Sequence, residues 1–379
     1  MLYIHIPFCK GKCIYCDFYS GGNPDWSKYL KVVATELRSR IDELRGDSLS
    51  SIYIGGGTPS LIPAKDFEDF ISEIKTIISG NEIDFSSDME FTIEVNPEDV
   101  CAENIKAWKN AGVNRVSMGI QSLSNSELTL IRRRHTAEKA LDSLYKLKQH
   151  FNNISIDIIY GIPGQTQQSL HESLEKILLA RPAHISAYAL TYEPKTLLYY
   201  LREKGEIREC PEELYLDFDN LIQQKLEGSG YERYEISNYS LAGMKSRHNR
   251  GYWQRKKYVG LGPSASSYDG ARIRRTNPAN LKAYVNHFSE SRSIATPFYE
   301  EETLSKTEMM EEEIMVSLRT KEGINLDRFE AEFGKTASEY LIGKSQKWID
   351  SGMLIHADSR LALTREGISI SDLIILDLA

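Results

Sequence analysis

Cysteine is scarce in this 379-residue chain, which contains five in total. An odd and small number of thiols excludes a disulfide-stapled extracellular scaffold. Two of the five, Cys101 and Cys210, stand alone in the sequence, and we expect both to be small, partly buried residues.

Long apolar runs are missing as well. No stretch approaches the roughly 18 consecutive apolar residues of a membrane-spanning helix, so we expect no transmembrane segment. The first residues also lack the basic segment and long apolar core that mark a secretory signal. We therefore expect a cytoplasmic protein, and peripheral contact with a membrane surface stays open.

The chain has no excess of positive charge. Its 46 Lys and Arg residues stand against 54 Asp and Glu residues, and its formal net charge is −8. Because sequence-independent nucleic-acid binding needs a basic surface, we expect no nucleic-acid partner. An apolar fraction of 41% and a charged fraction of 26% are typical of a globular protein and exclude disordered and collagen-like classes.

Strand-length apolar runs alternate with helix-length segments over the first half of the chain. This alternation predicts an α/β fold with a parallel sheet, but periodicity does not choose between a doubly wound sheet and an incomplete (β/α) barrel. In both folds, functional residues gather at the carboxyl ends of the strands. The predicted strands are 2–6, 51–54, 90–95, 115–120, 154–160 and 184–190, and the predicted helices are 26–44, 65–78, 103–110, 137–148 and 169–179.

The pattern changes after about residue 212. A predicted helix (214–226) and strand (231–236) lead into a loop rich in glycine and aromatic residues, from His248 to Tyr268. Several helices and a small hairpin follow, an order similar to a winged-helix module, but no basic recognition helix accompanies them, which disfavours DNA binding. We divide the chain into a core at 1–285, which carries that loop, and a small helical C-terminal domain at 286–379. The last section is predicted as helices 306–318, 326–333 and 337–350, strands 353–356 and 360–363, and a final helix.

Three cysteines fall within eight residues directly after the first predicted strand: Cys9, Cys13 and Cys16. A structural zinc usually takes four ligands, and no second cysteine pair exists to complete such a site. Three thiolates would leave one position of a metal centre open, which suits a [4Fe-4S] cluster whose fourth iron binds a substrate. Tyr15 and Phe8 would shield such a cluster from water.

Four other strand ends carry unusual segments: Gly55–Pro59, Asn96–Asp99, Gln121–Ser122 and Gly161–Gly164. The glycines of the first segment would allow the backbone to approach a ligand closely, although a bare tight turn also explains them. Glu94, at a strand end, is an acceptor suited to ribose hydroxyls or an ammonium group. Asp157 interrupts an apolar strand, and a buried carboxylate needs a partner.

The spacing Cys9-x3-Cys13-x2-Cys16, with Tyr15 before the third cysteine, resembles that of the radical S-adenosylmethionine (SAM) enzymes. The fuller strings 3–9 and 15–18 are similar to the branch that contains oxygen-independent coproporphyrinogen III oxidases and heme chaperones. The resemblance covers essentially the whole chain. It implies a partial (β/α)6 barrel with a C-terminal helical, winged-helix-like domain, and a [4Fe-4S] cluster held by the three cysteines.

The resemblance also implies SAM as a cofactor, chelated by the open iron. In such enzymes an electron, supplied by a donor such as flavodoxin or ferredoxin, passes through the cluster and cleaves SAM to methionine and a 5′-deoxyadenosyl radical. Arg132, Arg133 and Arg134 form a run from which any one could point inward. The positions that match SAM contacts in this branch are Tyr3, Gly56, Gly57, Thr58, Glu94, Gln121, Arg133 and Asp157, with Tyr15 as the aromatic beside the cluster.

Two features bear on the choice within the branch. The oxidases have a further cysteine two positions after the third cluster cysteine, where this chain has Phe18. Residues 248–253 match the string HNxxYW, which is associated with the heme chaperones. Heme is a flat apolar macrocycle whose iron accepts an imidazole, so we expect His248 to contact heme. A core histidine within an aromatic cluster is the alternative.

Two functions of different classes follow. A chaperone, which we favour, would bind heme as cargo and deliver it to a heme-dependent respiratory protein, with SAM and the cluster regulating or coupling transfer. An oxidase would decarboxylate two propionates of coproporphyrinogen III to give protoporphyrinogen IX, and its anionic substrate would favour arginines such as Arg132–Arg134, Arg247 and Arg250. Radical chemistry on an unrelated small molecule is a third alternative.

Overall fold

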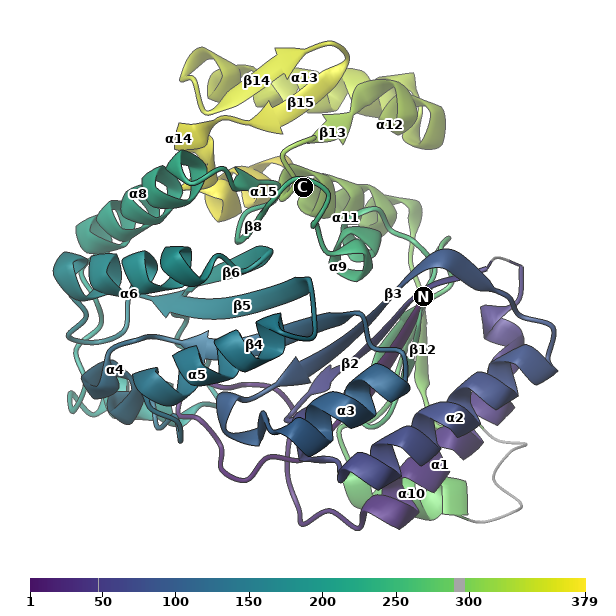
Figure 1. The fold of residues 1–379 in the computed structure, drawn as a ribbon. Coiled ribbons are helices and arrows are strands. Elements are labelled where there is room, and N and C mark those ends of the chain that lie inside the picture. The colour runs from purple at the N-terminus through teal and green to yellow at the C-terminus, as the bar shows by residue number, and fades with distance from the viewer. Residues whose placement is uncertain (47, 290–296) are drawn as a thin grey trace.

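The first half of the chain forms an incomplete barrel of six parallel strands (Figure 1). The computed structural model describes residues 1–46, 48–289 and 297–379. Strands that follow one another along the chain also neighbour one another in the sheet, whereas the strand order of a doubly wound sheet reverses. The expected partial (β/α)6 barrel is therefore confirmed. Its strands are β1 (Leu2–Ile6), β2 (Leu49–Gly56), β3 (Phe85–Val95), β4 (Arg115–Gln121), β5 (Asn153–Tyr160) and β6 (His184–Ala189).

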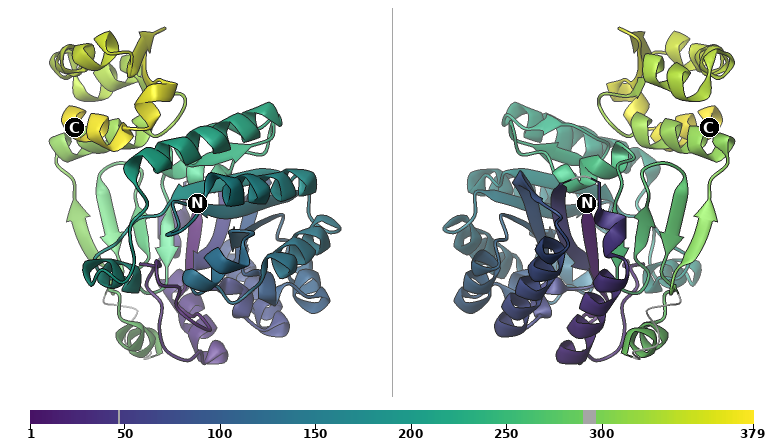
Figure 2. Two further views of the ribbon diagram at one scale, coloured as in Figure 1. Left: turned by 90° about the vertical axis from the view of Figure 1, so that its left-hand side faces the viewer. Right: turned by 90° about the vertical axis from the view of Figure 1, so that its right-hand side faces the viewer.

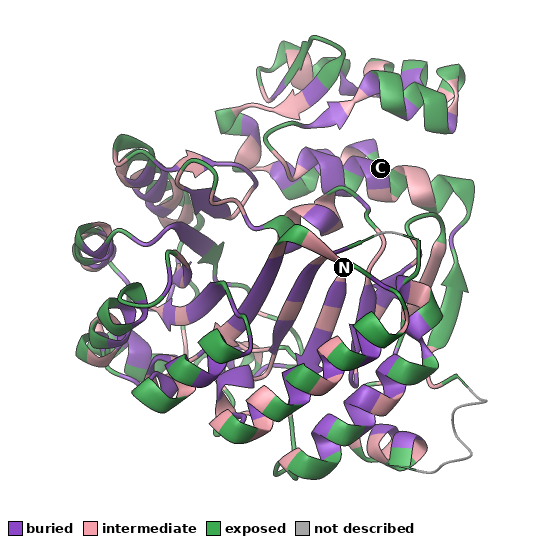
Figure 3. Ribbon diagram, turned by 45° about the vertical axis from the view of Figure 1, so that its right-hand side comes forward, coloured by how far each residue is buried: buried purple, intermediate pink, exposed green. Residues whose placement is uncertain are grey.

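Helices cover the outer face of this sheet. The outward side chains of the strands, such as Ile4, Ile52 and Ile93, are fully buried beneath them, and Figure 3 shows buried strands behind helices whose outer faces are exposed. Short 3-10 turns at Ile41–Leu44, Pro59–Leu61 and Pro97–Asp99 complete the connections. The helices are α1 (Trp26–Ser39), α2 (Ala64–Gly80), α3 (Ala102–Asn110), α4 (Asn125–Leu130), α5 (Ala137–Lys148) and α6 (Gln167–Ala180).

The inner face of the barrel is polar. Successive side chains of a strand point to opposite faces, so the residues between the outward apolar ones point inward. A parallel sheet buried on both faces usually reads as continuous apolar runs, whereas this one alternates. Arg115 is 1% exposed and Thr92 is fully buried, and both face the interior from adjacent strands. The inward-facing positions of the sheet therefore place charged side chains such as Arg115 in the low-dielectric interior of the barrel.

Elements from the second half extend the sheet at both edges. β9 (Val259–Leu261) pairs in parallel with β1, and β8 (Asn238–Ser240) pairs antiparallel with β6. The predicted strand 231–236 is reduced to β7 (Glu232–Arg233), which forms a hairpin with β8. Also present are α7 (Leu197–Glu203), α8 (Glu212–Gly228), α10 (Leu281–Ser289), β10 (Ser266–Tyr268), β11 (Ile273–Thr276) and β12 (Glu300–Thr303).

The segment predicted as a loop from His248 begins as a helix, α9 (Arg247–Trp253). The Ser246 side chain caps this helix by accepting a hydrogen bond from the Asn249 backbone N–H at 3.3 Å. The prediction of a loop was therefore wrong for these residues. α9 contacts β2 near its amino end and lies close to the N-terminus of the chain (Figure 1).

The last section has its own apolar core and lies on the side of the barrel where the strands begin (Figure 2). Arg255 contacts Glu313 across this boundary at 3.2 Å. Among the described residues, no helix is long and apolar enough to cross a membrane. The division at 285/286 stays a prediction. The elements are α11 (Lys306–Leu318), β13 (Ile324–Asn325), α12 (Leu326–Phe333), α13 (Lys335–Asp350), β14 (Leu354–Ala357), β15 (Arg360–Leu363), α14 (Arg365–Ile368) and α15 (Ser371–Leu378).

A buried carboxylate ties the first helix to this later part of the chain. Glu36 on α1 is fully buried and accepts hydrogen bonds from Arg40 at 3.1 Å and from Tyr284 at 2.6 Å. It also accepts from the Asn277 side chain at 2.7 Å and from the Gly262 backbone N–H at 2.8 Å. Because a buried charge is costly unless it is paired, this cluster holds β9 and α10 against α1.

Candidate cofactor site

The three clustered cysteines lie on the loop between β1 and α1, at the carboxyl end of the first strand. All three cysteine residues are partly exposed. Lys10, between them, pairs with the buried Asp99 at 2.9 Å, and the Cys16 backbone N–H donates to the Cys13 carbonyl at 3.3 Å. The loop is therefore anchored to the turn that follows β3 while its thiols stay accessible.

The donor set has the chemistry of an iron–sulfur cluster site, since cysteine thiolates are the usual ligands of such clusters. Cys9 and Cys13 lie near enough to Cys16 to affect its ionisation. Within the described ranges, no three His, Cys, Asp or Glu side chains form a group that could hold a single metal ion. Burial raises the pKa of the Cys16 thiol, and the nearby Cys13 and Cys9 thiols add to that rise. A cationic metal centre would reverse this effect, since coordination deprotonates a thiol.

Hydrogen bonds connect two of these thiols through three other side chains. Thr58 donates to the Cys9 sulfur at 3.3 Å, and Arg133 Nη1 donates to the Cys13 sulfur at 3.5 Å. Asn96 lies between the donors: its Nδ2 donates to Thr58 Oγ1 at 3.2 Å, and its Oδ1 accepts from Arg133 Nη2 at 2.7 Å. Sequence reasoning flagged the segment Asn96–Asp99 but did not single out Asn96 as a site residue.

Of the three consecutive arginines at 132–134, Arg133 is the one whose side chain points inward. Arg132 and Arg134 are exposed, whereas Arg133 reaches the cysteine loop and also donates to the Gly119 carbonyl at 2.7 Å. Arg132 has a left-handed backbone, with φ of 55°, which turns the chain so that its neighbour points inward.

The two aromatic residues of the cysteine loop have different surroundings. Tyr15 lies beside Cys13, and burial is the main cause that raises its pKa. Phe8 does not provide the expected shield: it is 2% exposed and packs edge-on against Trp26 and Tyr29 in the core. Tyr15 is therefore the aromatic that borders the thiols.

Close contacts within the protein explain the glycines at the end of β2, where Gly56 is the last residue of the strand and Gly57 follows it. A Cβ on Gly57 would lie 2.6 Å from the Phe8 carbonyl oxygen, and one on Gly56 would lie 2.5 Å from the His5 ring. Gly56 also has a φ of 110°, which disfavours any other residue. The close approach in this structure is therefore to the first strand and its loop, and it places Thr58 against Cys9.

Glu94 is the next-to-last residue of β3 and lies at the mouth of the barrel. Its carboxylate accepts from the Tyr53 hydroxyl at 2.8 Å and from the Gly56 backbone N–H at 3.0 Å. Burial raises the pKa of Glu94 to about 7, with Asp157 adding to the rise and the Tyr53 hydrogen bond opposing it. Tyr53 was missed by sequence reasoning, although alternation along the strand places it on the inner face.

The remaining predicted residues border the same space. Asp157 on β5 accepts from Ser117 at 3.5 Å, and burial raises its pKa. Tyr3 on β1 shares a hydrogen bond with His5 Nδ1 at 3.0 Å. Gln121 sits at an irregularity in the pairing of β4 with β5, with a left-handed φ of 69°. Gln121 ends β4, whereas Asp157 lies in the middle of β5 and Tyr3 near the beginning of β1, so these residues are set at different depths along the strands.

His248 lies elsewhere, at the opposite end of the strands. It is 1% exposed, and its Nδ1 and Nε2 share hydrogen bonds with Ser51 and Tyr252, both at 2.8 Å. Burial lowers the pKa of His248 to about 3, so the imidazole is neutral. Trp253, at the end of the same helix, lies 5.6 Å beneath the Arg319 guanidinium. Both nitrogens of the His248 ring therefore already have hydrogen-bond partners. The heme contact of His248 stays a prediction.

The structure also places the arginines of α9 and the two isolated cysteines. Arg247 pairs with Asp88 and Arg250 lies near Glu322, so these arginines of α9 are remote from the run at 132–134. Of the isolated cysteines, Cys210 is buried as expected, but Cys101 is exposed, and the expectation of burial was wrong for it.

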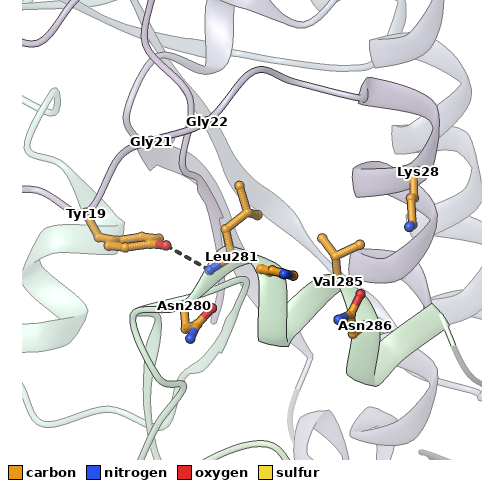
Figure 4. A pocket seen from close by; sticks show the side chains of 9 residues that line it. Tyr19, Gly21, Gly22, Lys28, Asn280, Leu281, Val285 and Asn286 are labelled. Carbon is orange, nitrogen blue, oxygen red and sulfur yellow. Dashed lines mark hydrogen bonds between the residues drawn. The ribbon is translucent and has the colours of Figure 1, made fainter.

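An open groove of about 510 Å³ lies outside the barrel (Figure 4). Tyr19, just after the cysteine loop, accepts a hydrogen bond from the Leu281 backbone N–H at 2.8 Å there, and Lys28 and Val285 also line it. None of the site residues predicted from the sequence lines this groove.

The barrel and the three-cysteine loop at its carboxyl rim define a radical SAM protein. Residues 3–177 match the Radical SAM superfamily, and residues 304–370 match the HemN C-terminal domain. This superfamily implies a [4Fe-4S] cluster and SAM as cofactors. The fold is also that of coproporphyrinogen III oxidase (HemN) from Escherichia coli, with a TM-score of 0.83 over 100% of this chain and 89% of that one, at 20% identity.

Sequence comparison places the chain more narrowly. It is 33% identical to the heme chaperone HemW of Bacillus subtilis, over 96% of this chain and 95% of that protein. It is 35% identical to the heme chaperone HemW of Lactococcus lactis, over 98% of this chain and 94% of that protein. The chain belongs to the HemW family.

Proposed function

We propose that this protein is a heme chaperone, which binds heme as cargo and transfers it to a heme-dependent protein. The observation that carries the proposal is the similarity, over nearly the whole length, to two relatives named heme chaperone HemW. The fold shared with an oxidase at 20% identity does not by itself favour oxidase activity. The arginines of α9, which the anionic substrate of an oxidase would favour, lie instead against Asp88 and Glu322.

The cluster is assigned to Cys9, Cys13 and Cys16, which would leave one iron for SAM. When bound and reduced, a [4Fe-4S] cluster supplies one electron to SAM. Thr58 and Arg133 donate hydrogen bonds to two of the sulfurs and so offset the negative charge that thiolates bring to the loop. A one-electron donor such as a flavodoxin or ferredoxin is part of the proposal.

SAM is assigned to the carboxyl rim of the barrel. Its ammonium and sulfonium groups are cationic, and Glu94 and Asp157 supply carboxylates that face the same interior. The backbone of residues 56–58 lies directly beside Cys9, where the amino-acid end of SAM would reach the open iron. Tyr3, Tyr15, Gln121 and Arg133 are the other proposed contacts. The rim residues would bind and orient SAM, while burial keeps water from the cationic groups.

Heme is assigned to α9 through His248. Its Nε2 shares a hydrogen bond with the Tyr252 hydroxyl, so coordination of heme iron would replace that hydrogen bond. A heme-acceptor protein, in the cytoplasm or at a membrane surface, would receive the cargo.

Heme titration and transfer test the proposal. The reconstituted protein is titrated with heme under anaerobic conditions, and the Soret band is followed. An apo heme protein is then added, and its holo spectrum is recorded with and without SAM. We expect stoichiometric heme uptake and transfer to the acceptor. Heme uptake no greater than the non-specific uptake of a protein without a heme site, run in parallel, or loaded protein that keeps its heme, would contradict the proposal.

A further inference from the structure

Asn96 occupies a central place between the cysteine loop and the barrel rim. It follows β3 directly, and Pro97 after it favours the extended backbone that Asn96 adopts, with φ of −94° and ψ of 145°. Its backbone N–H donates to Ser60 Oγ at 3.1 Å, which fixes the start of the turn. The side chain is therefore held in one orientation, toward Thr58 and Arg133.

The amide of Asn96 determines which way both neighbours donate. Because Nδ2 donates to Thr58 Oγ1, the single hydroxyl hydrogen of Thr58 is free to point at the Cys9 sulfur. Because Oδ1 accepts from Arg133 Nη2, the guanidinium is turned so that Nη1 reaches the Cys13 sulfur. One group must donate and accept at once, and an amide does this where a carboxylate or an alkyl group does not.

We infer that Asn96 is a positioning residue that aims hydrogen bonds at the Cys9 and Cys13 sulfurs and thereby sets the reduction potential of the bound [4Fe-4S] cluster. Hydrogen bonds to ligand sulfurs disperse the negative charge that arrives with an electron, so they favour the reduced state. The inference rests on the cluster assignment in the proposed function and is independent of the heme assignment. Asn96 acts through Thr58 and Arg133 and does not itself touch a cysteine sulfur in the described contacts.

The test is a redox titration of the reconstituted protein, followed by electron paramagnetic resonance of the reduced cluster. Asn96→Leu removes both amide contacts without adding charge and keeps the branched shape of the side chain. Thr58→Val removes only the hydroxyl that donates to Cys9, and Thr58→Ser retains it. Asn104→Leu is the matched control, since it makes the same substitution beside the same turn, where the Asn104 side chain donates to the Asp99 carbonyl at 2.8 Å rather than to Thr58.

We expect a more negative midpoint potential for Asn96→Leu, a smaller shift in the same direction for Thr58→Val, and wild-type values for Thr58→Ser and Asn104→Leu. An intact cluster with a wild-type midpoint in Asn96→Leu would overturn the inference. If Asn96→Leu takes up no cluster, Thr58→Val decides: an unchanged midpoint there also overturns it. A wild-type protein that takes up no cluster overturns the cluster assignment itself, and this inference with it.

Discussion

The ring centroids of Tyr53 and His248 lie 5.0 Å apart inside the barrel, with an angle of 30° between the ring planes. Tyr53 donates its hydroxyl hydrogen to Glu94 at the carboxyl rim, while His248 belongs to α9 at the other end of the strands. One tyrosine therefore connects the helix to which heme is assigned with the carboxylate to which SAM is assigned. This connection is short because Tyr53, on the inner face of β2, contacts both His248 and Glu94 itself.

Removal of the Tyr53 hydroxyl should change how SAM binding depends on pH. The pKa of Glu94 is about 7, so its carboxylate forms as pH rises from 6 to 8, and affinity for cationic SAM should rise by about tenfold. His248, with a pKa of about 3, stays neutral throughout. Tyr53→Phe removes a hydrogen bond that lowers the Glu94 pKa, so the rise should move to higher pH. Equilibrium dialysis of SAM at several pH values measures this, and identical profiles for both proteins would contradict the assignment of Glu94.

Replacement of a cluster ligand should remove the cluster. Cys13→Ala leaves two thiols on the loop, so the brown absorbance near 400 nm and the bound iron and sulfide should fall to about background. Cys101→Ala is the matched control, because Cys101 is exposed and distant in sequence from the loop. Iron and sulfide analysis after anaerobic reconstitution decides the matter. A full cluster in Cys13→Ala would show that the ligand set is different.

The role of His248 can be separated from its packing. His248→Ala should weaken heme binding and also destabilise the fold by about 2 kcal/mol, since the buried Ser51 hydroxyl loses its partner. Tyr252→Phe instead frees Nε2 while the imidazole stays in place, so heme should bind more tightly if Nε2 coordinates iron. Heme titrations of both variants give the answer. Unchanged affinity in a folded His248→Ala protein would move the heme site elsewhere.

The buried Glu36 cluster predicts a large effect on stability. Glu36→Gln removes the charge that balances Arg40 in a site where the Glu36 side chain is fully buried, so the free energy of unfolding should fall by about 3 kcal/mol. Glu43→Gln, which loses a partly exposed partner of the same arginine, should cost less than about 1 kcal/mol. Urea unfolding compares the two. Equal losses would mean that burial does not control the energetics here.

Local pattern predicted the elements of the barrel well. The apolar runs of β1 to β6 and the helices between them alternate with periods that the sequence displays directly, and the cysteine loop is contiguous in the chain. The order of strands in the sheet depends on contacts between distant segments, which periodicity does not encode. The choice of a barrel over a doubly wound sheet therefore came from the resemblance and then from the structure.

The site was predicted less completely than the fold. Thr58 and Arg133 follow from the motif, but the side chain of Asn96, which connects them, bonds to partners 38 and 37 positions away in the sequence. The sequence predicts a loop at α9 because Gly251 and the aromatic residues around it disfavour a helix, whereas the Ser246 cap and burial of His248 stabilise one. Contacts between distant parts of the chain therefore determine both the position of the Asn96 side chain and the formation of α9.

The central claim is that the protein carries heme rather than converting a porphyrinogen. The most direct measurement incubates the anaerobically reconstituted, reduced protein with SAM and coproporphyrinogen III, and separates the tetrapyrroles and 5′-deoxyadenosine by chromatography. The same preparation is loaded with heme and mixed with an apo heme protein. The account predicts heme transfer to the acceptor and no decarboxylated tetrapyrrole. Stoichiometric formation of protoporphyrinogen IX together with 5′-deoxyadenosine would contradict it.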